Sequence, residues 1–371
     1  MLDHNSHVYN IHGLVNIKSS VSLRELALFE VKPEGTLFEL SFFGGKVDGA
    51  LDLVIETGLD VVNDRRRTYF KYSELGSIGA SIQVELGHPL RIGVSSLLAK
   101  SEHVLYTNVV EPLLRFLFVS KGYILLHSAC LSTPQGGLLI SAPPDTGKTT
   151  TILKLILQSQ EFLFLSDDMT ILTPTRKAYC FPKPPTISLH TLEAIGYDYR
   201  TLYRLPCLVL RSRVHSKAGR SFMRGLGKRN LPILSLNALG QILVPPPKPP
   251  ILSLIGPERL GQTCPINALC FIAQGKPVFT EMSLDAALTM VEANSDDAFN
   301  FPPYNDIVGD IEIDGRSYWE LQSMERSMLR RLLKTLRVHF LRLEGHSWQN
   351  QIMRVFETEE PVPSKIEEIM V

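Results

Sequence analysis

The stretch Gly137-Leu-Leu-Ile-Ser-Ala-Pro-Pro-Asp-Thr-Gly-Lys-Thr-Thr150 decides the fold expected for this chain. Ala142 to Thr149 has the spacing of a phosphate-binding loop, with alanine in place of the usual first glycine. The backbone N–H groups of such a loop form an anion nest, and the following helix adds its positive N-terminal dipole. Lys148 would hold the terminal phosphates of a nucleotide, and Thr149 would offer its hydroxyl to Mg²⁺. We therefore expect a nucleotide-binding core.

Two prolines in this loop, Pro143 and Pro144, lack the N–H groups that bind phosphate. The ATP-binding residues are therefore expected in the rest of the loop and the first helical turn: Asp145, Thr146, Gly147, Lys148, Thr149 and Thr150. A strand-to-helix turn that contains an incidental lysine is the alternative interpretation.

The segments around the loop have the pattern of an α/β unit. Short apolar runs at 123–126, 137–140 and 162–165 are typical of buried strands, and a helix-like stretch covers 149–158. Strand, loop, helix and strand in this order are the local arrangement of a nucleotide-binding α/β domain.

Two adjacent acids, Asp167 and Asp168, follow the apolar run at 162–165. Beside a phosphate loop, one carboxylate can hold Mg²⁺ while the other accepts a proton. Alone, such a pair is often only a turn or a helix cap. His127 ends the run at 123–126 and is expected to contact Asp167 if the two strands are neighbours, although a lone histidine in such a place is more often structural.

Three motifs in this order resemble the catalytic core of the HPr kinase/phosphorylase family: Leu125-Leu-His-Ser-Ala129, Leu139-Ile-Ser-Ala-Pro-Pro-Asp-Thr-Gly-Lys-Thr149 and Phe164-Leu-Ser-Asp-Asp168. That family shares its nucleotide-binding fold with phosphoenolpyruvate carboxykinases, and the resemblance covers about residues 119–172. It implies an ATP-dependent, Mg²⁺-requiring kinase that acts on a serine-type or small-molecule hydroxyl. It also implies that Lys148 binds the β- and γ-phosphates, that Thr149 and Asp168 hold Mg²⁺, and that Asp167, assisted by His127, is the base.

Departures from the family pattern argue against phosphorylase activity and against HPr itself as the acceptor. Ala142 replaces the first glycine, Thr150 replaces an acid, and the downstream signature of the bifunctional enzyme is not found. The chain therefore resembles a divergent member. A protein that binds ATP for regulation or assembly, without phosphoryl transfer, is the alternative, but it would have no use for a paired base and His127. A GTP-dependent switch is disfavoured because no Asn-Lys-x-Asp motif occurs.

Basic residues concentrate between 200 and 229, where no acid occurs. The segment is interpreted either as a solvated loop or as an arginine-rich lid over the substrates. Lys183 lies in a proline-bounded turn after the Asp-Asp pair and either faces the substrate or belongs to an extended edge segment. The candidate substrate contacts are Lys183, Arg211, Arg213 and Arg220.

Three regions are expected along the chain: a β-rich N-terminal module at 1–100, the α/β phosphate-loop kinase core at 101–310, and a C-terminal helical extension with a tail at 311–371. The apolar pattern predicts a helix over 102–119 that Pro112 kinks or divides. It also predicts a basic amphipathic helix from Tyr318 to about Leu343. The proline-rich stretch 244–250 is expected to be an extended connector.

Composition excludes several classes of protein. The 38 basic and 38 acidic side chains balance, which argues against a dedicated nucleic-acid binder. No apolar run approaches the roughly 20 residues of a membrane helix, and the first residues do not resemble an export signal. The five cysteines contain no CxxC pair, so neither disulfides nor a zinc site is indicated. We therefore expect a cytoplasmic protein with no membrane span; homo-oligomerisation and the identity of the acceptor stay open.

Overall fold

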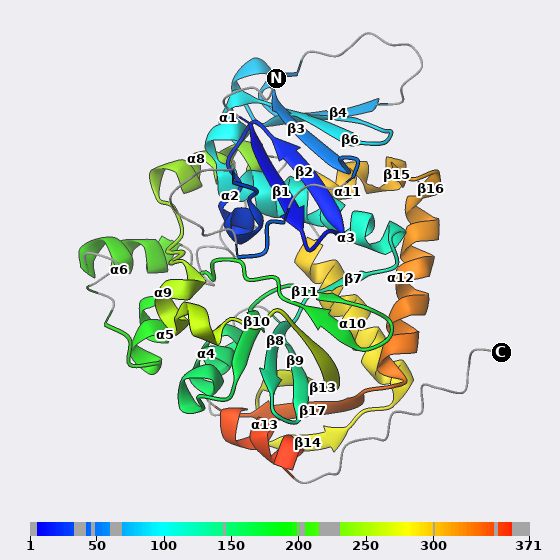
Figure 1. Ribbon diagram of the computed structural model, residues 1–371. Coiled ribbons are helices and arrows are strands. Elements are labelled where there is room, and N and C mark those ends of the chain that lie inside the picture. The colour runs from blue at the N-terminus through cyan, green and yellow to red at the C-terminus, as the bar shows by residue number, and fades with distance from the viewer. Residues whose placement is uncertain are drawn as a thin grey trace, which may run out of the picture.

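Two β-sheets with helices between and around them form the computed structural model of this chain (Figure 1). The structure describes residues 6–32, 42–45, 49–59, 69–143, 146–198, 200, 205–214, 231–299, 301–344 and 348–357. Within these ranges, the two larger sheets have six and nine strands, and a third, small sheet has two. The protein therefore has a mixed α/β fold, as the sequence predicts.

The N-terminal sheet has the strand order β1-β2-β3-β6-β5-β4. Its strands are β1 His7–Ile11, β2 Val15–Ser19, β3 Leu53–Thr57, β4 Tyr69–Ser73, β5 Ser81–Glu85 and β6 Leu90–Val94. A 3-10 turn, Arg24–Phe29, follows β2. The described part of the N-terminal region is therefore rich in β-strands, as the sequence predicts.

An almost continuous helical stretch connects the two sheets. It consists of α1 Ser96–Lys100, α2 Glu102–Leu105, a π-helical turn Tyr106–Val110 and α3 Glu111–Ser120. The π turn ends at Val110, two residues before Pro112, because the missing N–H and the bulky ring of proline cannot continue a regular α-helical ladder. The helix predicted over 102–119 is therefore confirmed, and Pro112 interrupts its regular geometry as expected.

The large sheet has the order β10-β8-β9-β13-β12-β11-β7, with β17 beside β13 and β14 beside β17. Its strands are β7 Ile124–Leu126, β8 Ala129–Thr133, β9 Gly136–Ser141, β10 Leu163–Ser166, β11 Thr170–Leu172, β12 Lys177–Tyr179, β13 Thr263–Gln274, β14 Val278–Glu281 and β17 Arg337–Leu343. The long β13 runs parallel to β9 and β17, whereas β8 is antiparallel to both β9 and β10. A separate pair, β15 Glu312–Ile313 and β16 Arg316–Ser317, precedes α12.

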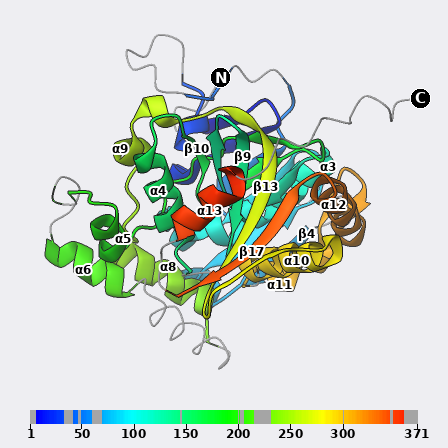
Figure 2. The ribbon, with the colours of Figure 1, turned by 90° about the horizontal axis from the view of Figure 1, so that it is seen from below.

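Nine further α-helices lie within the described residues. They are α4 Lys148–Gln158, α5 Leu189–Ala194, α6 Leu205–Val214, α8 Ile233–Leu243, α9 Ile251–Ile255, α10 Leu284–Phe299, α11 Tyr304–Ile307, α12 Tyr318–Leu333 and α13 Trp348–Glu357. Of these, α4 contacts β8 and β10, and α12 contacts β7 of the large sheet. Figure 2 shows α4 and α13 next to each other, and the two helices are in contact. Residues 244–250, between α8 and α9, form neither helix nor strand, as expected of a connector. No helix within the described ranges is both long and apolar enough to cross a membrane.

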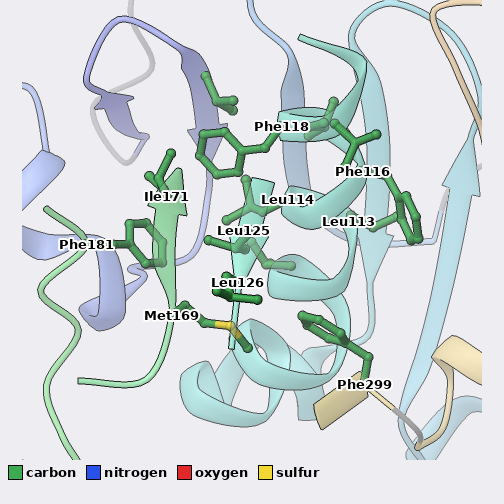
Figure 3. Close-up of a cluster of buried hydrophobic side chains, with 14 of the residues drawn as sticks. Leu113, Leu114, Phe116, Phe118, Leu125, Leu126, Met169, Ile171, Phe181 and Phe299 are labelled. Atoms are coloured by element: carbon green, nitrogen blue, oxygen red, sulfur yellow. The ribbon is translucent and has the colours of Figure 1, made fainter. Parts of the chain in front are cut away.

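Buried side chains from both sheets and from α3 belong to one continuous hydrophobic core. Figure 3 shows α3 residues such as Leu114 and Phe118 facing Leu125 on β7 and Ile171 on β11. A second core lies under α4 and α13 and contains the fully buried Trp348. Buried apolar surface of this kind fixes the position of α3 between the two sheets.

The C-terminal region differs from the prediction. The helix expected to reach about Leu343 ends at Leu333, and Arg337–Leu343 form β17, which joins the large sheet. The reason is tertiary: β17 buries Val338 and Leu341 by pairing with β13, and a helix could not provide this pairing. A buried ion pair between Arg115 on α3 and Glu325 holds α12 against α3.

Candidate functional site

The β9–α4 connection has the strand, loop and helix order predicted from the sequence. β9 ends at Ser141 and α4 begins at Lys148. Gly147 has φ +107°, in the left-handed region that favours glycine. The hydroxyl of Thr146 donates a hydrogen bond to the carbonyl of Pro143 at 2.8 Å, which tightens the turn. Asp145 lies outside the described residues.

Two short connections between strands meet beside this loop. His127 and Ser128 link β7 to β8, and residues 167–169 link β10 to β11. Because β8 pairs with β10 and β7 pairs with β11, the two connections are adjacent. Nε2 of His127 lies 3.1 Å from Oδ1 of Asp168. Strand pairing therefore brings together a histidine and an acid that are 41 residues apart.

Asp168 is the exposed carboxylate of the pair, with 43% of its side chain accessible. Besides His127, it contacts Nζ of Lys148 at 3.1 Å and Nζ of Lys183 at 3.0 Å. Burial of its surroundings disfavours the anion, but the charges of Lys183 and Lys148, with the His127 contact, hold the pKa of Asp168 well below its ordinary value. Asp168 is therefore a charged group held between cations.

Asp167 has different surroundings. It is 6% exposed, and its Oδ2 accepts a hydrogen bond from the hydroxyl of Thr149 at 3.1 Å. Its buried Oδ1 accepts no hydrogen bond from the residues that the structure describes. Burial raises the pKa of Asp167 to about 6. From the sequence, His127 was expected to contact Asp167, and the family resemblance implied that Thr149 acts together with Asp168. In the structure, His127 contacts Asp168 instead, and Thr149 contacts Asp167.

His127 is also held on its other side. Its Nδ1 lies 3.3 Å from the carbonyl of Asn294 on α10. The Asn294 side chain donates to Oγ of Ser141 at 3.1 Å, and Ser141 in turn donates to the carbonyl of His127 at 3.1 Å. The end of β9 and α10 together therefore fix the imidazole against Asp168.

Lys183 reaches the site from the extended segment after β12. It is 7% exposed, and its ammonium contacts both Asp168 and the carboxylate of Glu111 on α3. Burial disfavours this ammonium, but Asp168 and Glu111 outweigh the burial and raise the pKa of Lys183. Lys183 is therefore a buried, charged group that links α3 to the Asp-Asp connection.

Thr149 and Asp167 are the residues of this site that could hold a Mg²⁺ ion. Hydroxyl and carboxylate oxygens are the ligands that Mg²⁺ prefers, and the unpartnered Oδ1 of Asp167 suits a cation. No group of three or more His, Cys, Asp or Glu side chains that could hold a metal occurs in the described part of the chain. A Mg²⁺ ion at Thr149 and Asp167 would take its other ligands from phosphate oxygens and water, as this cation commonly does.

A comparison with known proteins finds no family model and no curated protein that matches this sequence.

The other predicted residues lie farther from these contacts or outside the described ranges. Thr150 is buried and contacts Thr191 on α5, with 3.3 Å between the hydroxyl oxygens. Arg211 and Arg213 lie on α6, which packs against α5 at the edge of the molecule (Figure 1). Arg220 is not among the described residues. Of the predicted substrate contacts, the structure brings Lys183 to the Asp-Asp pair.

Glu111 and Asn294 contribute to the site but were not predicted from the sequence. The signal for Glu111 was available, because it is an isolated acid within the apolar run of 104–119. A charge in such a run is buried when the helix packs and then requires a partner. Asn294 gives no comparable signal, because its contact with His127 is made by a backbone carbonyl.

Proposed function

We propose that this chain is an ATP-dependent kinase that transfers the γ-phosphoryl group to a hydroxyl of its acceptor. The observation that carries the proposal is the convergence of Lys148, His127 and Lys183 on Asp168, beside the Thr149–Asp167 pair at the start of α4. The resemblance of residues 125–129, 139–149 and 164–168 to HPr kinases supports the same reaction. The fold would then be a divergent phosphate-loop core of the HPr kinase and phosphoenolpyruvate carboxykinase type.

The loop and α4 would bind the phosphates of ATP. Lys148 pairs with Asp168 in this structure, and it would exchange this carboxylate for the terminal phosphates when the nucleotide binds. Thr149 and Asp167 would hold Mg²⁺, which neutralises charge on the phosphate oxygens when bound. Backbone N–H groups at the N-terminus of α4 would complete the anion site.

Asp168 is the group best placed to accept the proton of the acceptor hydroxyl. Its carboxylate is accessible, whereas Asp167 is buried against Thr149. The hydroxyl would give its proton to Asp168 as its oxygen forms a bond to the γ-phosphorus, while the bond from that phosphorus to the leaving oxygen of ADP breaks. His127 would orient Asp168, and Lys183 would balance the charge beside it. The base assigned here is therefore Asp168 rather than Asp167.

An ADP-release assay with Mg²⁺-ATP tests the proposal directly. The acceptors are free serine, sugars, polyols, nucleosides and serine-containing peptides. We expect ADP release that requires an acceptor and is lost in Lys148→Ala. Lys154→Ala, which removes a lysine farther along α4, is the matched control and should keep the activity. Tight ATP binding without turnover on any acceptor would instead support a nucleotide-binding regulator.

A further inference from the structure

A second group of polar side chains lies outside the contacts described so far. It joins Glu25 from the 3-10 turn after β2, His103 from α2 and Lys248 from the connector between α8 and α9. Oε1 of Glu25 lies 2.6 Å from Nδ1 of His103 and 3.0 Å from Nζ of Lys248. Three distant parts of the chain, including the N-terminal module, therefore contribute to one charged cluster.

The π-helical turn connects this cluster to the candidate site. The N–H of Glu111 donates to the carbonyl of Tyr106, which is the five-residue spacing of a π turn and places these two residues one above the other. The ring centre of Tyr106 lies 5.8 Å from Nζ of Lys183. Burial, with the nearby carboxylates of Glu111 and Glu25, raises the pKa of Tyr106. The N–H of Tyr106 also bonds to the carbonyl of His103, so this helical stretch joins the Glu25–His103–Lys248 group to Glu111.

The exposure of these groups follows a pattern. Glu25, Tyr106, Glu111 and Lys183 are all less than a tenth exposed. Solvent reaches His103 and Lys248, whose side chains are 23% and 18% exposed, as well as Asp168. The cluster therefore combines buried charges with partly exposed polar groups.

The cluster also has hydrogen-bonding capacity that the protein does not use. Oε2 of Glu25 is buried and accepts no hydrogen bond from the described residues. An ammonium group has three N–H donors; Lys183 contacts two carboxylates, and Lys248 contacts one carboxylate and His103. A buried carboxylate oxygen without a partner costs about 1–3 kcal/mol, which a purely structural ion pair would avoid. A polar ligand could therefore accept hydrogen bonds from the remaining N–H groups of Lys183 and Lys248 and donate one to Oε2 of Glu25.

We propose that Lys183, Glu111, Tyr106, Glu25, His103 and Lys248 form the acceptor subsite, and that the acceptor is a small hydroxyl compound with an additional anionic group. This inference rests on the proposed kinase function. The ammonium groups of Lys183 and Lys248 would bind the anionic group, and Oε2 of Glu25 would accept a hydrogen bond from another polar group of the acceptor. The N-terminal module therefore contributes to substrate selection through Glu25.

Equilibrium binding in the absence of ATP tests the subsite. The probes are two matched series, namely glycerol, glycerate and glycerol 3-phosphate, and glucose, gluconate and glucose 6-phosphate, together with a serine-containing peptide. We expect an anionic member to bind at least tenfold more tightly than its neutral counterpart, and Lys248→Met to weaken that binding at least tenfold. Comparing the affinity for glycerate and gluconate with that for glycerol 3-phosphate and glucose 6-phosphate shows whether the site prefers a carboxylate or a phosphate. Preference for a neutral polyol or the peptide, or no binding of any anionic probe, would overturn the assignment.

Two further variants separate a binding role from a structural one. Lys121→Met is the matched control, because Lys121 also pairs with a buried carboxylate of the N-terminal module, Asp52, at 2.7 Å. It should leave probe binding unchanged. The double variant Glu25→Gln/Lys248→Met leaves no unpaired buried charge and replaces Lys248→Met if that variant does not fold. It should also lose the anionic probe while its affinity for ATP stays unchanged, and retained probe binding would contradict the proposal.

The outcomes also distinguish this inference from the proposed function. If an anionic probe binds through Lys248 but no acceptor ever supports ADP release, the kinase proposal fails and the binding site stands. If a serine-containing peptide is phosphorylated and the small anions neither bind nor react, the kinase proposal stands and the subsite assignment fails.

Discussion

Thr149, in the first turn of α4, donates a 3.1 Å hydrogen bond to Oδ2 of Asp167 at the end of β10. The adjacent Asp168 makes no such bond and instead faces His127, Lys148 and Lys183. Two neighbouring carboxylates thus have separate environments, because successive residues leaving a strand point in different directions. The different surroundings of Asp167 and Asp168 predict different functions for the two carboxylates, which kinetic measurements can distinguish.

The two aspartates should respond differently to conversion to asparagine. Asp168→Asn should lower kcat by about 10²–10⁴-fold, because it removes the proposed base. Asp167→Asn should mainly raise the Mg²⁺ concentration needed for half-maximal activity, because it removes a proposed ligand of the ion. Steady-state kinetics over a range of Mg²⁺ concentrations separates these effects. If Asp167→Asn loses kcat without a change in Mg²⁺ dependence, the roles are the reverse of those assigned here.

Nucleotide binding should stabilise the folded chain through Lys148. At a ligand concentration 100 times Kd, binding adds about 2.7 kcal/mol to the free energy of unfolding. We expect Mg²⁺-ATP to raise Tm in the natural chain and in Lys154→Ala but not in Lys148→Ala. Removal of Mg²⁺ with a chelator should reduce the shift. Thermal unfolding measures these shifts in Tm. An equal increase in Tm in all three proteins would show that the nucleotide does not bind at Lys148.

His103 should make stability depend on pH. Burial and the nearby charge of Lys248 lower the pKa of His103 to about 4, although Glu25 opposes this effect. Between about pH 6.5 and pH 4 the unfolded chain therefore binds a proton that the folded chain does not. The free energy of unfolding should fall by about 1–3 kcal/mol as the pH decreases through this range.

The variant His103→Gln should lack this part of the pH dependence. The difference between the two proteins is the quantity to measure, because Asp167 and Glu111 have raised pKa values and act in the opposite direction in both. Urea unfolding at several pH values between about 5 and 6.5 gives this difference, because a glutamate of the unfolded chain stays mostly ionised in this range. Parallel curves for the two proteins would show that His103 is not buried as a neutral ring.

Removing one partner of the Arg115–Glu325 pair should lower the free energy of unfolding strongly. Replacing both partners with apolar side chains should lower it less. Both side chains are about 5% exposed or less, and two hydrogen bonds of 2.8 and 2.7 Å join them. Arg115→Met alone should cost about 3–5 kcal/mol, because it leaves a buried carboxylate without its partner. The double variant Arg115→Met/Glu325→Leu should cost less than either single change. Equilibrium urea unfolding measures all three, and additive losses would contradict this account.

The prediction for α12 shows where sequence periodicity fails. Residues 318–333 form the expected helix, which starts at a capping box formed by Ser317 and Glu320. Residues 337–343 continue the basic and apolar composition, but they form a strand because β13 offers an unpaired edge. Local pattern could not distinguish these outcomes, because the partner strand lies more than 60 residues earlier in the chain.

Lys183, in the candidate site, is a second case in which the local sequence pattern could not predict a long-range contact. Its proline-bounded turn identified it as a candidate, but the sequence did not reveal that it would be buried between Asp168 and Glu111. The contact with Glu111 depends on how α3 packs against β7, which buried apolar surface decides. The contacts of Lys248 with Glu25 and His103 likewise depend on how the connector packs against α2 and the N-terminal module.

The sequence by itself determined the strand, loop and helix order from β9 to α4, the helix that precedes β7, and the candidates His127, Lys148, Thr149, Asp167 and Asp168. These features are local, because hydrophobic period, glycine and proline positions and motif spacing act over a few residues. Only the tertiary structure decided which aspartate meets His127 and which meets Thr149, and that Glu25, Glu111 and Lys248 extend the charged cluster. Strand register and helix packing join residues far apart in the chain, and these long-range contacts depend on the whole buried core.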